Sequence, residues 1–323
     1  MFDVFFFEAF KEEQEALKKY LPHDVTAGFF ENTVQEWEAA SVPAPLVSMR
    51  TQSVIPEKWM EQISGILTRS TGYDHILRMR KKTSVDVPAG YLPLYCSRSV
   101  AEQALLLWMC LLRKLPQQVK QLSQFNRGGL TGTEVRDKTL VAVGVGNIGY
   151  EVCCIGRGLG MKVLGVDIIK KYNDIQYVTP EQGVANADII VCAMNLTDKN
   201  RGYFTYELLR RSKPGAVFVN IARGELSPPE PLLRLVKEGH LGGAGIDVYD
   251  NESELACTLR SGWNSGSAAI KAYLDLIQQP NVICTPHNAF NTEEAVQRKT
   301  VQSVEQVVSF VQTGEFIWKV PGV

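Results

Sequence analysis

The stretch Val141-Ala-Val-Gly-Val-Gly-Asn-Ile-Gly149 decides the fold of this 323-residue chain. Its apolar start predicts a buried strand, and the apolar residues that follow predict a helix. The three glycines have the G-x-G-x-x-G spacing of a dinucleotide-binding βαβ unit, where they allow a tight turn, approach of a pyrophosphate and close packing of helix on strand. Phosphates then lie at the N-terminus of the helix, which favours negative charge. The predicted cofactor contacts in this stretch are Gly144, Gly146, Asn147, Ile148 and Gly149.

A second apolar segment, residues 161–167, predicts the next strand of the same unit and ends in an acid. Asp167 lies 23 residues after Gly144, close to the ~20 expected for the acid that binds the cofactor ribose. A carboxylate there accepts hydrogen bonds from both ribose hydroxyls of NAD and repels the additional phosphate of NADP. The sequence therefore predicts an NAD-binding domain, and the alternative is an ordinary glycine-rich loop in an α/β protein.

Length and composition favour a soluble protein of two domains. Hydrophobic residues make up 45% of the chain and charged residues 21%, the values of an ordinary globular protein. A net charge of −1 leaves no basic footprint for nucleic acid or for an anionic membrane. The apolar run 104–112 is far shorter than the ~20 residues of a membrane-spanning helix, so it predicts a buried helix.

The seven cysteines form no C-x-x-C motif and no Cys/His cluster with zinc spacing. The first eight residues place acids where a secretory signal needs basic residues. Reduced thiols in the cytoplasm are the simplest interpretation, and no metal site is expected.

Alternating strand and helix patterns predict an α/β fold with two domains, each a parallel sheet flanked by helices. Residues 1–97 predict the first part of a smaller, flavodoxin-like substrate domain. Residues 98–290 predict a doubly wound Rossmann domain for NAD, inserted into the smaller one. Residues 291–323 have helical apolar spacing and are expected to return to the substrate domain. The six strands predicted for the Rossmann domain are 140–144, 162–167, 188–193, 216–220, 242–247 and 282–284.

A long helix is expected from 98 to 115, stopped by Pro116. Its apolar residues 104–112 offer more apolar surface than one face of a sheet can cover. This excess favours a homodimer joined through the cofactor domain.

Three further patches, 219–224, 245–252 and 285–290, follow predicted strands of the Rossmann domain. They supply an arginine, several carboxylates and a histidine. Residues 69–75 form a similar loop after a predicted strand of the first domain. Ligands of open α/β sheets bind at such carboxyl ends of strands, so these patches are the candidate site.

These patches, in this order after G-x-G-x-x-G, resemble the D-isomer-specific 2-hydroxyacid dehydrogenases over nearly the whole chain, and most closely their D-lactate dehydrogenase-like branch. The resemblance implies NAD-dependent interconversion of a small 2-keto acid and a D-2-hydroxy acid. It implies that Arg223 binds the substrate carboxylate and polarises the keto oxygen, that His287 is the acid/base, and that Glu252 orients His287. Asp247 would face the nicotinamide side of the cofactor.

The resemblance also implies contacts with the substrate. The backbone of Ser70, Thr71 and Gly72 would hold the carboxylate. Tyr95 and Phe290 match aromatic positions of the D-lactate dehydrogenase branch and would close the side-chain end of the pocket, with core packing as the alternative. One further residue, Arg50, lies just beyond a predicted strand and is either a second substrate cation or a solvated surface residue.

The chemistry requires these residue types. Hydride transfer to a keto carbon builds negative charge on oxygen, which a fixed guanidinium stabilises while an imidazolium donates the proton. A neighbouring carboxylate favours the imidazolium. Glu252 is chosen for that carboxylate because it lies five residues after Asp247, but Asp250 and Glu254 are close by. The segment 257–272 departs from the family pattern and is expected to be a local insertion.

Pyruvate and D-lactate are the favoured substrate pair. Reduction of hydroxypyruvate or phenylpyruvate is the alternative within the family. A different class, an NAD(H)-sensing corepressor that binds without turnover, uses the same fold and retains the same three side chains, so only a turnover assay separates it from an enzyme.

Overall fold

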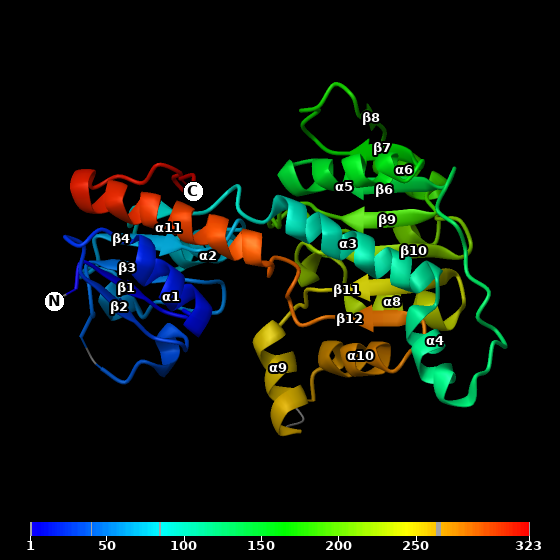
Figure 1. Ribbon diagram of the computed structural model, residues 1–323, viewed down its shortest axis with the longest axis horizontal. Coiled ribbons are helices and arrows are strands. Elements are labelled where there is room, and N and C mark those ends of the chain that lie inside the picture. The colour runs from blue at the N-terminus through cyan, green and yellow to red at the C-terminus, as the bar shows by residue number, and fades with distance from the viewer. Residues whose placement is uncertain (1, 40, 84, 263–265, 323) are drawn as a thin grey trace. The chain divides into compact units, whose positions relative to one another are not determined.

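The computed structural model describes residues 2–39, 41–83, 85–262 and 266–322 of the chain. The chain divides into two compact units (Figure 1). The first unit is built from Met1–Cys96 and Asn291–Val323, and the second from Ser97–Phe290.

The first unit is a five-stranded parallel sheet in the order β2-β1-β3-β4-β5, the order of flavodoxin-like folds. Helix α11 packs against α1 and against β4, and its N-cap Thr292 accepts a hydrogen bond from Ala295 N. The elements are β1 (Val4–Phe6), α1 (Lys11–Tyr20), β2 (Ala27–Phe29), η1 (Val34–Glu36), β3 (Leu46–Met49), η2 (Glu57–Trp59), β4 (Gly65–Thr68), α2 (Asp74–Thr83), β5 (Ala89–Gly90) and α11 (Glu293–Thr313).

Three details of the first unit differ from the expectation. The polar stretch 56–62, whose sequence has helical character, forms only the 3-10 turn η2. His75, expected in a loop, lies in the first turn of α2 and shares a hydrogen bond of 2.9 Å between its Nε2 and Thr68 Oγ1. Strand β5 was not expected, because two residues are too short to show a period.

The second unit is a seven-stranded sheet of parallel strands in the order β12-β11-β10-β9-β6-β7-β8 (Figure 1). All six expected strands are present, and the short edge strand β8 adds a seventh. All five residues of β6 are buried, as its apolar sequence predicts. The strands are β6 (Thr139–Val143), β7 (Lys162–Val166), β8 (Gln176–Tyr177), β9 (Ile189–Cys192), β10 (Ala216–Asn220), β11 (Leu241–Ile246) and β12 (Val282–Cys284).

Helices cover both faces of this sheet, as a doubly wound fold requires. Helices α3 and α5 pack together, and α3 crosses β10 and β11. It can approach closely because a Cβ added at Gly245 would lie 2.9 Å from Leu107 of α3. Pro229 begins α8, where a fixed φ suits the first helical position. The helices are α3 (Ser97–Leu112), α4 (Leu115–Gln121), η3 (Leu122–Gln124), α5 (Asn147–Gly158), α6 (Pro180–Asn186), α7 (Tyr206–Leu209), η4 (Gly224–Leu226), α8 (Pro229–Lys237), α9 (Glu252–Ser261) and α10 (Ala268–Ile277).

The expected long helix ends earlier than Pro116. Helix α3 stops at Leu112, Lys114 takes a left-handed conformation with φ 53°, and Pro116 lies in the first turn of α4. Proline is tolerated in a first turn because the N–H it lacks has no partner there. No helix in the described part of the chain is long and apolar enough to cross a membrane.

Candidate active site

The glycine loop after β6 has the geometry that a dinucleotide requires. Gly144 has φ +90°, and a Cβ there would lie 2.5 Å from the backbone of Met194. A Cβ at Gly149 would lie 1.9 Å from Gly144 O, so only glycine lets α5 pack this closely on the strand. Gly146 caps α5, is exposed, and has open space where a Cβ would be. These residues fit a pyrophosphate bound at the N-terminus of α5.

Asp167 lies directly after β7, beside this loop. Its Oδ2 accepts a hydrogen bond of 2.6 Å from Val145 N, and its Oδ1 accepts one of 2.9 Å from Ile169 N. Asn147 is the first residue of α5, with Ile148 behind it, and its Oδ1 accepts a hydrogen bond of 3.1 Å from Lys171 Nζ. The carboxylate expected at the cofactor ribose is therefore fixed next to the glycine loop.

The arginine, the aspartate and the histidine follow three neighbouring parallel strands. Arg223 comes three residues after β10, Asp247 directly after β11, and His287 three residues after β12. Since β10, β11 and β12 are adjacent, these residues occupy the same sheet edge, which is also the edge of the glycine loop after β6.

His287 and Glu252 are in direct contact. His287 Nδ1 lies 2.7 Å from Glu252 Oε2, and each side chain is 27% exposed. Glu252 is the first residue of α9, whereas Asp250 uses its backbone N–H to donate to Tyr273 Oη at 3.0 Å. The remaining ring nitrogen of His287, Nε2, is the one that can transfer a proton to a substrate.

The backbone of His287 is left-handed, with φ 51°. Such a conformation is uncommon outside glycine and is found at functional sites where the surrounding structure holds it. Asp247, which is fully buried, stabilises the backbone conformation at His287. Its Oδ1 accepts hydrogen bonds from Thr285 Oγ1 at 2.5 Å and Asn288 N at 3.0 Å, and its Oδ2 accepts one from Ala289 N at 3.0 Å.

Burial raises the pKa of the Asp247 carboxyl above its usual value, against the effect of these hydrogen bonds. In the described part of the chain, the hydrogen bonds that this carboxylate accepts all come from the loop that carries His287. The resemblance predicted that Asp247 faces the cofactor, and the contacts add a second use for it, which is to fix the histidine loop.

Arg223 directly precedes the turn η4, and its Nη1 donates a hydrogen bond of 2.8 Å to Ala222 O. Asn220 Nδ2 holds the turn through Arg223 O at 2.8 Å. The next residue, Gly224, packs against the loop before Glu252, because a Cβ there would lie 2.0 Å from Asp250 N. The arginine turn and the loop that leads to Glu252 are thus in backbone contact.

In the first unit, Ser70, Thr71 and Gly72 form a fixed loop after β4. Ser70 Oγ donates a hydrogen bond of 2.7 Å to Gly72 O, and Thr71 Oγ1 donates one of 3.0 Å to Leu92 O. Among the described residues, the backbone N–H groups of Thr71 and Gly72 have no acceptor. They are free to bind an anion such as a carboxylate.

The three other residues expected at the substrate differ in exposure. Tyr95 is buried in the first unit, where burial raises the pKa of its hydroxyl well above the usual value. Phe290 is half-buried in the second unit and accepts a hydrogen bond of 3.3 Å at its carbonyl from Ser99 Oγ. Arg50 is half-buried, and its guanidinium lies 4.8 Å from the centre of the Phe10 ring.

Sequence reasoning missed a buried group of charges in the first unit, Glu13, Arg69 and Lys299. Lys299 Nζ and Arg69 Nε lie 2.7 Å and 2.9 Å from Glu13 Oε1. Arg69 directly precedes the loop at Ser70. The available signal was the position of Lys299, which interrupts the apolar spacing of a helix.

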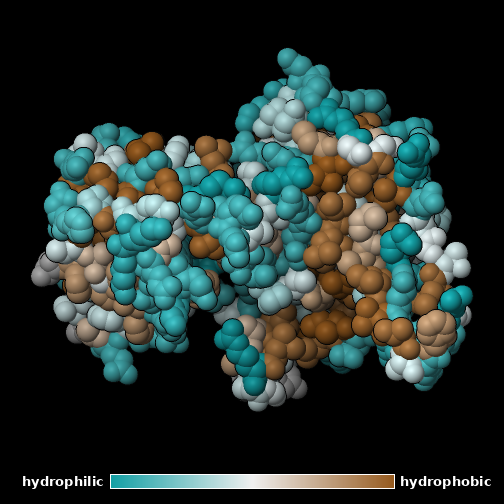
Figure 2. Space-filling view, viewed as in Figure 1, coloured by the Kyte–Doolittle hydropathy of each residue, from teal (hydrophilic) through white to brown (hydrophobic). Residues whose placement is uncertain are grey.

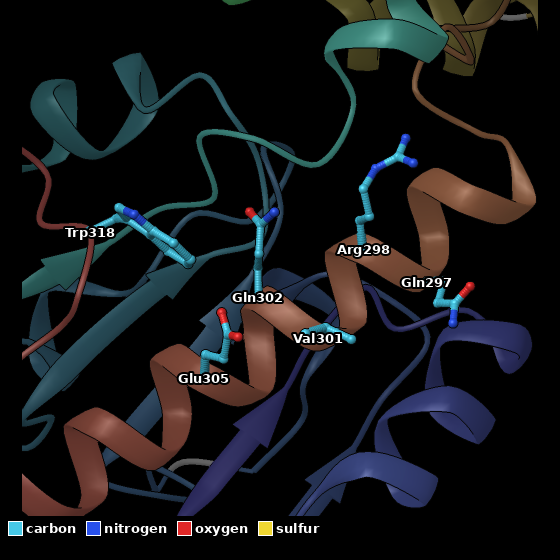
Figure 3. Close-up of a pocket in the computed structure, with 6 residues that line it drawn as sticks. All are labelled: Gln297, Arg298, Val301, Gln302, Glu305 and Trp318. Carbon is cyan, nitrogen blue, oxygen red and sulfur yellow. The ribbon is translucent and has the colours of Figure 1, made fainter.

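A surface hollow lies beside α11 in the first unit, and one of its lining residues, Arg298, donates a hydrogen bond of 2.9 Å from its Nε to Tyr95 O. Figure 3 shows that its side chains come from α11, with one from the C-terminal segment. They are Gln297, Arg298, Val301, Gln302, Glu305 and Trp318. In the part of the chain that the structure describes, no group of three or more His, Cys, Asp or Glu side chains could hold a metal ion.

The segment 257–272 continues α9 and begins α10, and its residues 263–265 lie outside the described residues. Ser267 caps α10 by accepting a hydrogen bond from Ile270 N. This segment therefore holds the second half of α9, the helix that begins at Glu252, and the first half of α10.

The chain is similar to several known proteins. Residues 105–289 match the family described as D-isomer specific 2-hydroxyacid dehydrogenase, NAD binding domain. A D-lactate dehydrogenase of Streptococcus agalactiae is 30% identical, over 80% of this chain and 79% of its own. An aromatic 2-oxoacid reductase of Clostridium sporogenes is 34% identical, over 72% of this chain and 71% of its own. The crystal structure of a D-lactate dehydrogenase from Aquifex aeolicus with NAD and lactic acid has a TM-score of 0.84 and 25% identity, over 99% of this chain and 100% of that one.

Proposed function

The chain belongs to the D-isomer specific 2-hydroxyacid dehydrogenase family, and we propose that pyruvate and D-lactate are its substrate pair. As a member of this family it is an NAD-dependent oxidoreductase that interconverts 2-keto acids and D-2-hydroxy acids. The observation that carries the choice of site is the 2.7 Å contact of His287 with Glu252, at the sheet edge that also bears the glycine loop. We assign cofactor binding to 98–290 and substrate binding to 1–97 with 291–323.

Held by the glycine loop and Asp167, NADH would supply the hydride that reduces the keto carbon. In the proposed mechanism, Arg223 binds the substrate carboxylate and stabilises the charge that grows on the keto oxygen. His287 Nε2 donates the proton to that oxygen, while Glu252 holds Nδ1 and stabilises the imidazolium. Asp247 keeps the histidine loop in place through Thr285 and the N–H groups that follow it.

The substrate carboxylate would also accept hydrogen bonds from the free N–H groups of Thr71 and Gly72. We propose that Tyr95 and Phe290 leave room for little beyond a methyl or short apolar group, and that Arg50 is the residue that would receive a second anion. Hydroxypyruvate and phenylpyruvate remain the alternatives. The similarity to an aromatic 2-oxoacid reductase supports the second of them.

The test is a comparison of kcat/KM for pyruvate, hydroxypyruvate, phenylpyruvate and oxaloacetate, measured by oxidation of NADH. We expect pyruvate to lead. If kcat/KM for phenylpyruvate is tenfold higher than for pyruvate, a difference of about 1.4 kcal/mol in transition-state binding, the proposed small pocket is contradicted. A lead for oxaloacetate would place Arg50 at the second carboxylate. Retained NADH binding without any turnover would indicate a corepressor-like binding protein instead.

Replacing Glu252 with glutamine should shift the pH profile of keto acid reduction. Proton donation needs the imidazolium, and an amide in place of the carboxylate stabilises it less. The pH above which kcat/KM falls should therefore move to a lower value. Asp250→Asn is the matched control and should leave the profile in place, because the Asp250 contact in this region is made by its backbone. A shift produced by Asp250→Asn in place of Glu252→Gln would mean that the wrong acid has been chosen.

We propose a homodimer joined through the second unit. Figure 2 shows apolar residues gathered over α3 and α4. Contiguous exposed apolar surface of this kind marks an interaction site. The exposed large apolar residues of these helices and the turn after them are Leu106, Leu115, Val119, Leu122 and Phe125.

Light scattering at micromolar concentration tests the dimer and should give about twice the 36.0 kDa of one chain. The double variant Val119→Lys, Leu122→Lys should shift the mass to that of the monomer, because the interface would have to bury two positive charges that have no partners. A 36.0 kDa species for the unmodified protein would rule the dimer out.

We propose a cytoplasmic location, without nucleic acid partners. The structure joins none of the cysteines in its described part by a disulfide, which is the usual state of thiols in a reducing compartment. The net charge of −1 offers no basic surface for phosphates of nucleic acid.

A further inference from the structure

Three charged side chains meet in the interior of the first unit. Glu13 lies on α1, Arg69 follows β4, and Lys299 lies on α11. The side chains of Arg69, Glu13 and Lys299 are 0%, 4% and 3% exposed. A single carboxylate oxygen, Glu13 Oε1, receives Arg69 Nε at 2.9 Å and Lys299 Nζ at 2.7 Å. We call these three residues the buried triad.

Arg69 connects the buried triad to the ends of the sheet strands. Its Nη1 donates to Ser48 Oγ at 3.0 Å, and its Nη2 donates to Phe7 O at 2.7 Å and Glu8 O at 3.1 Å. Its backbone N donates to Met49 O at 2.8 Å. These hydrogen bonds fix both the guanidinium and the backbone of Arg69. The next residue is Ser70, where the proposed substrate loop begins.

Stability alone is a poor reason for such an arrangement. Removing two or more charges from water costs free energy that their attraction often fails to return, and apolar side chains of similar volume often serve stability equally well. An apolar residue at position 299 would suit the buried face of α11. The buried triad also carries two cations against one carboxylate, and a third cation, Arg50, acts on both Glu13 and Lys299. With the buried carboxylate of Glu8, whose Oε2 accepts hydrogen bonds from Arg50 N and Ser53 N, the region behind the loop holds three cations and two carboxylates, so its charge balance is positive.

We propose that Glu13 and Lys299 are positioning residues for the Ser70–Gly72 loop, which they hold through Arg69 in the conformation that binds the substrate carboxylate. This inference rests on the proposed function. The orientation of the free N–H groups of Thr71 and Gly72 depends on the backbone at Arg69, and the excess positive charge behind the loop favours an anion in front of it.

The charge of Lys299 changes near neutral pH. Burial, together with Arg50 and Arg69, lowers the pKa of its ammonium group to about 7, while Glu13 opposes this shift. Glu13 itself stays ionised, because Arg69 and Lys299 outweigh its burial and lower its pKa to about 2. The charged groups that act on Lys299 are thus Glu13 from α1, Arg50 after β3 and Arg69 after β4. As pH rises through about 7, the region behind the loop loses one positive charge.

The experiment measures KM for the preferred keto acid, kcat, and the Kd of NADH in Lys299→Met and Glu13→Gln. We expect KM to rise tenfold or more in both variants, kcat to change less than threefold, and the Kd of NADH to stay unchanged. Lys299→Arg restores a cation and should recover most of the affinity for the keto acid. The KM of Lys299→Met divided by the KM of the unmodified protein should fall toward one above pH 7, where both proteins lack a positive charge at position 299.

The matched control is Arg80→Met. Arg80 is also a buried arginine of the first unit, paired with Asp86 at 3.0 Å, and it donates to Val87 O and Pro321 O instead of contacting the loop. It should lower the thermal midpoint without raising KM. An equal rise of KM in Arg80→Met, or an unchanged KM in a folded Glu13→Gln, would overturn the inference.

Failure of the proposed function would look different. In that case the unmodified protein reduces none of the four keto acids, so no KM exists to compare. If Lys299→Met fails to fold, Glu13→Gln still gives the comparison, because its side chain has nearly the same shape and keeps one oxygen that can accept the hydrogen bonds of Arg69 and Lys299.

Discussion

Replacing His287 with asparagine should lower the rate of keto acid reduction by about 10²- to 10⁴-fold, the usual contribution of a positioned acid/base. Asparagine is the informative choice because it tolerates the left-handed backbone at this position, where φ is 51°. The loop should therefore keep its contacts with Asp247, and binding of NADH should survive. Stopped-flow or steady-state oxidation of NADH measures the rate, and protein fluorescence measures the binding.

The control for this variant is His240→Asn. His240 is buried and lies directly before β11, so it occupies the sheet edge opposite the candidate site. Its Nε2 shares a hydrogen bond of 3.2 Å with Ser212 Oγ. This variant should lose stability and keep its rate. Near-normal turnover in His287→Asn would remove His287 from the mechanism.

Replacing Arg223 with methionine should lower kcat/KM by about 10²- to 10³-fold, since removal of one donor to a developing oxyanion typically costs that much. Methionine keeps the length and much of the volume of the side chain, so the turn at η4 should persist. Arg223→Lys should recover only part of the loss, because an ammonium cannot form the two parallel hydrogen bonds of a guanidinium with a carboxylate.

Arg260→Met serves as the control for the loss of a positive charge, because Arg260 is exposed near the end of α9. It should leave kcat/KM unchanged. If Arg223→Met loses affinity for NADH as strongly as activity on the keto acid, the arginine belongs to the cofactor and the substrate needs another partner.

The sequence predicted those features that depend on steric necessity. The glycine loop could be recognised because a Cβ at Gly149 would lie 1.9 Å from Gly144 O, and no other residue type fits there. The contact of His287 with Glu252 could be anticipated only through the family pattern. The spacing of five residues from Asp247 selects Glu252 over Asp250 only through that pattern, and in the fold it is the Glu252 carboxylate that lies 2.7 Å from His287 Nδ1.

The buried face of α11 was harder to predict. Its valines suggested an apolar stripe, yet Val301 is 38% exposed and Val311 is 41% exposed. The buried residues include Lys299 and Gln306 instead. Hydropathy assigns such residues to the surface, and only their partners explain their burial, which for Gln306 are the backbone at Tyr91, Ile317 and Trp318.

The contacts of Asp247 and the left-handed backbone at His287 also lay beyond sequence reasoning. Both depend on how the ends of β11 and β12 meet, and strand pairing is a long-range property. The two-residue strands β5 and β8 are missed for a simpler reason, since a period of two cannot appear in two residues.

The first unit is assembled from two chain segments that are separated by the whole of the second. During synthesis, β1 to β5 leave the ribosome long before α11 does. At 5–20 residues per second, the intervening stretch takes roughly 10 to 40 seconds to make. Until then nothing covers Gly65 of β4, against which Phe310 packs, and Glu13 and Arg69 lack Lys299. The contiguous second unit can fold first, whereas the nascent N-terminal sheet must wait for α11 before its packing is complete.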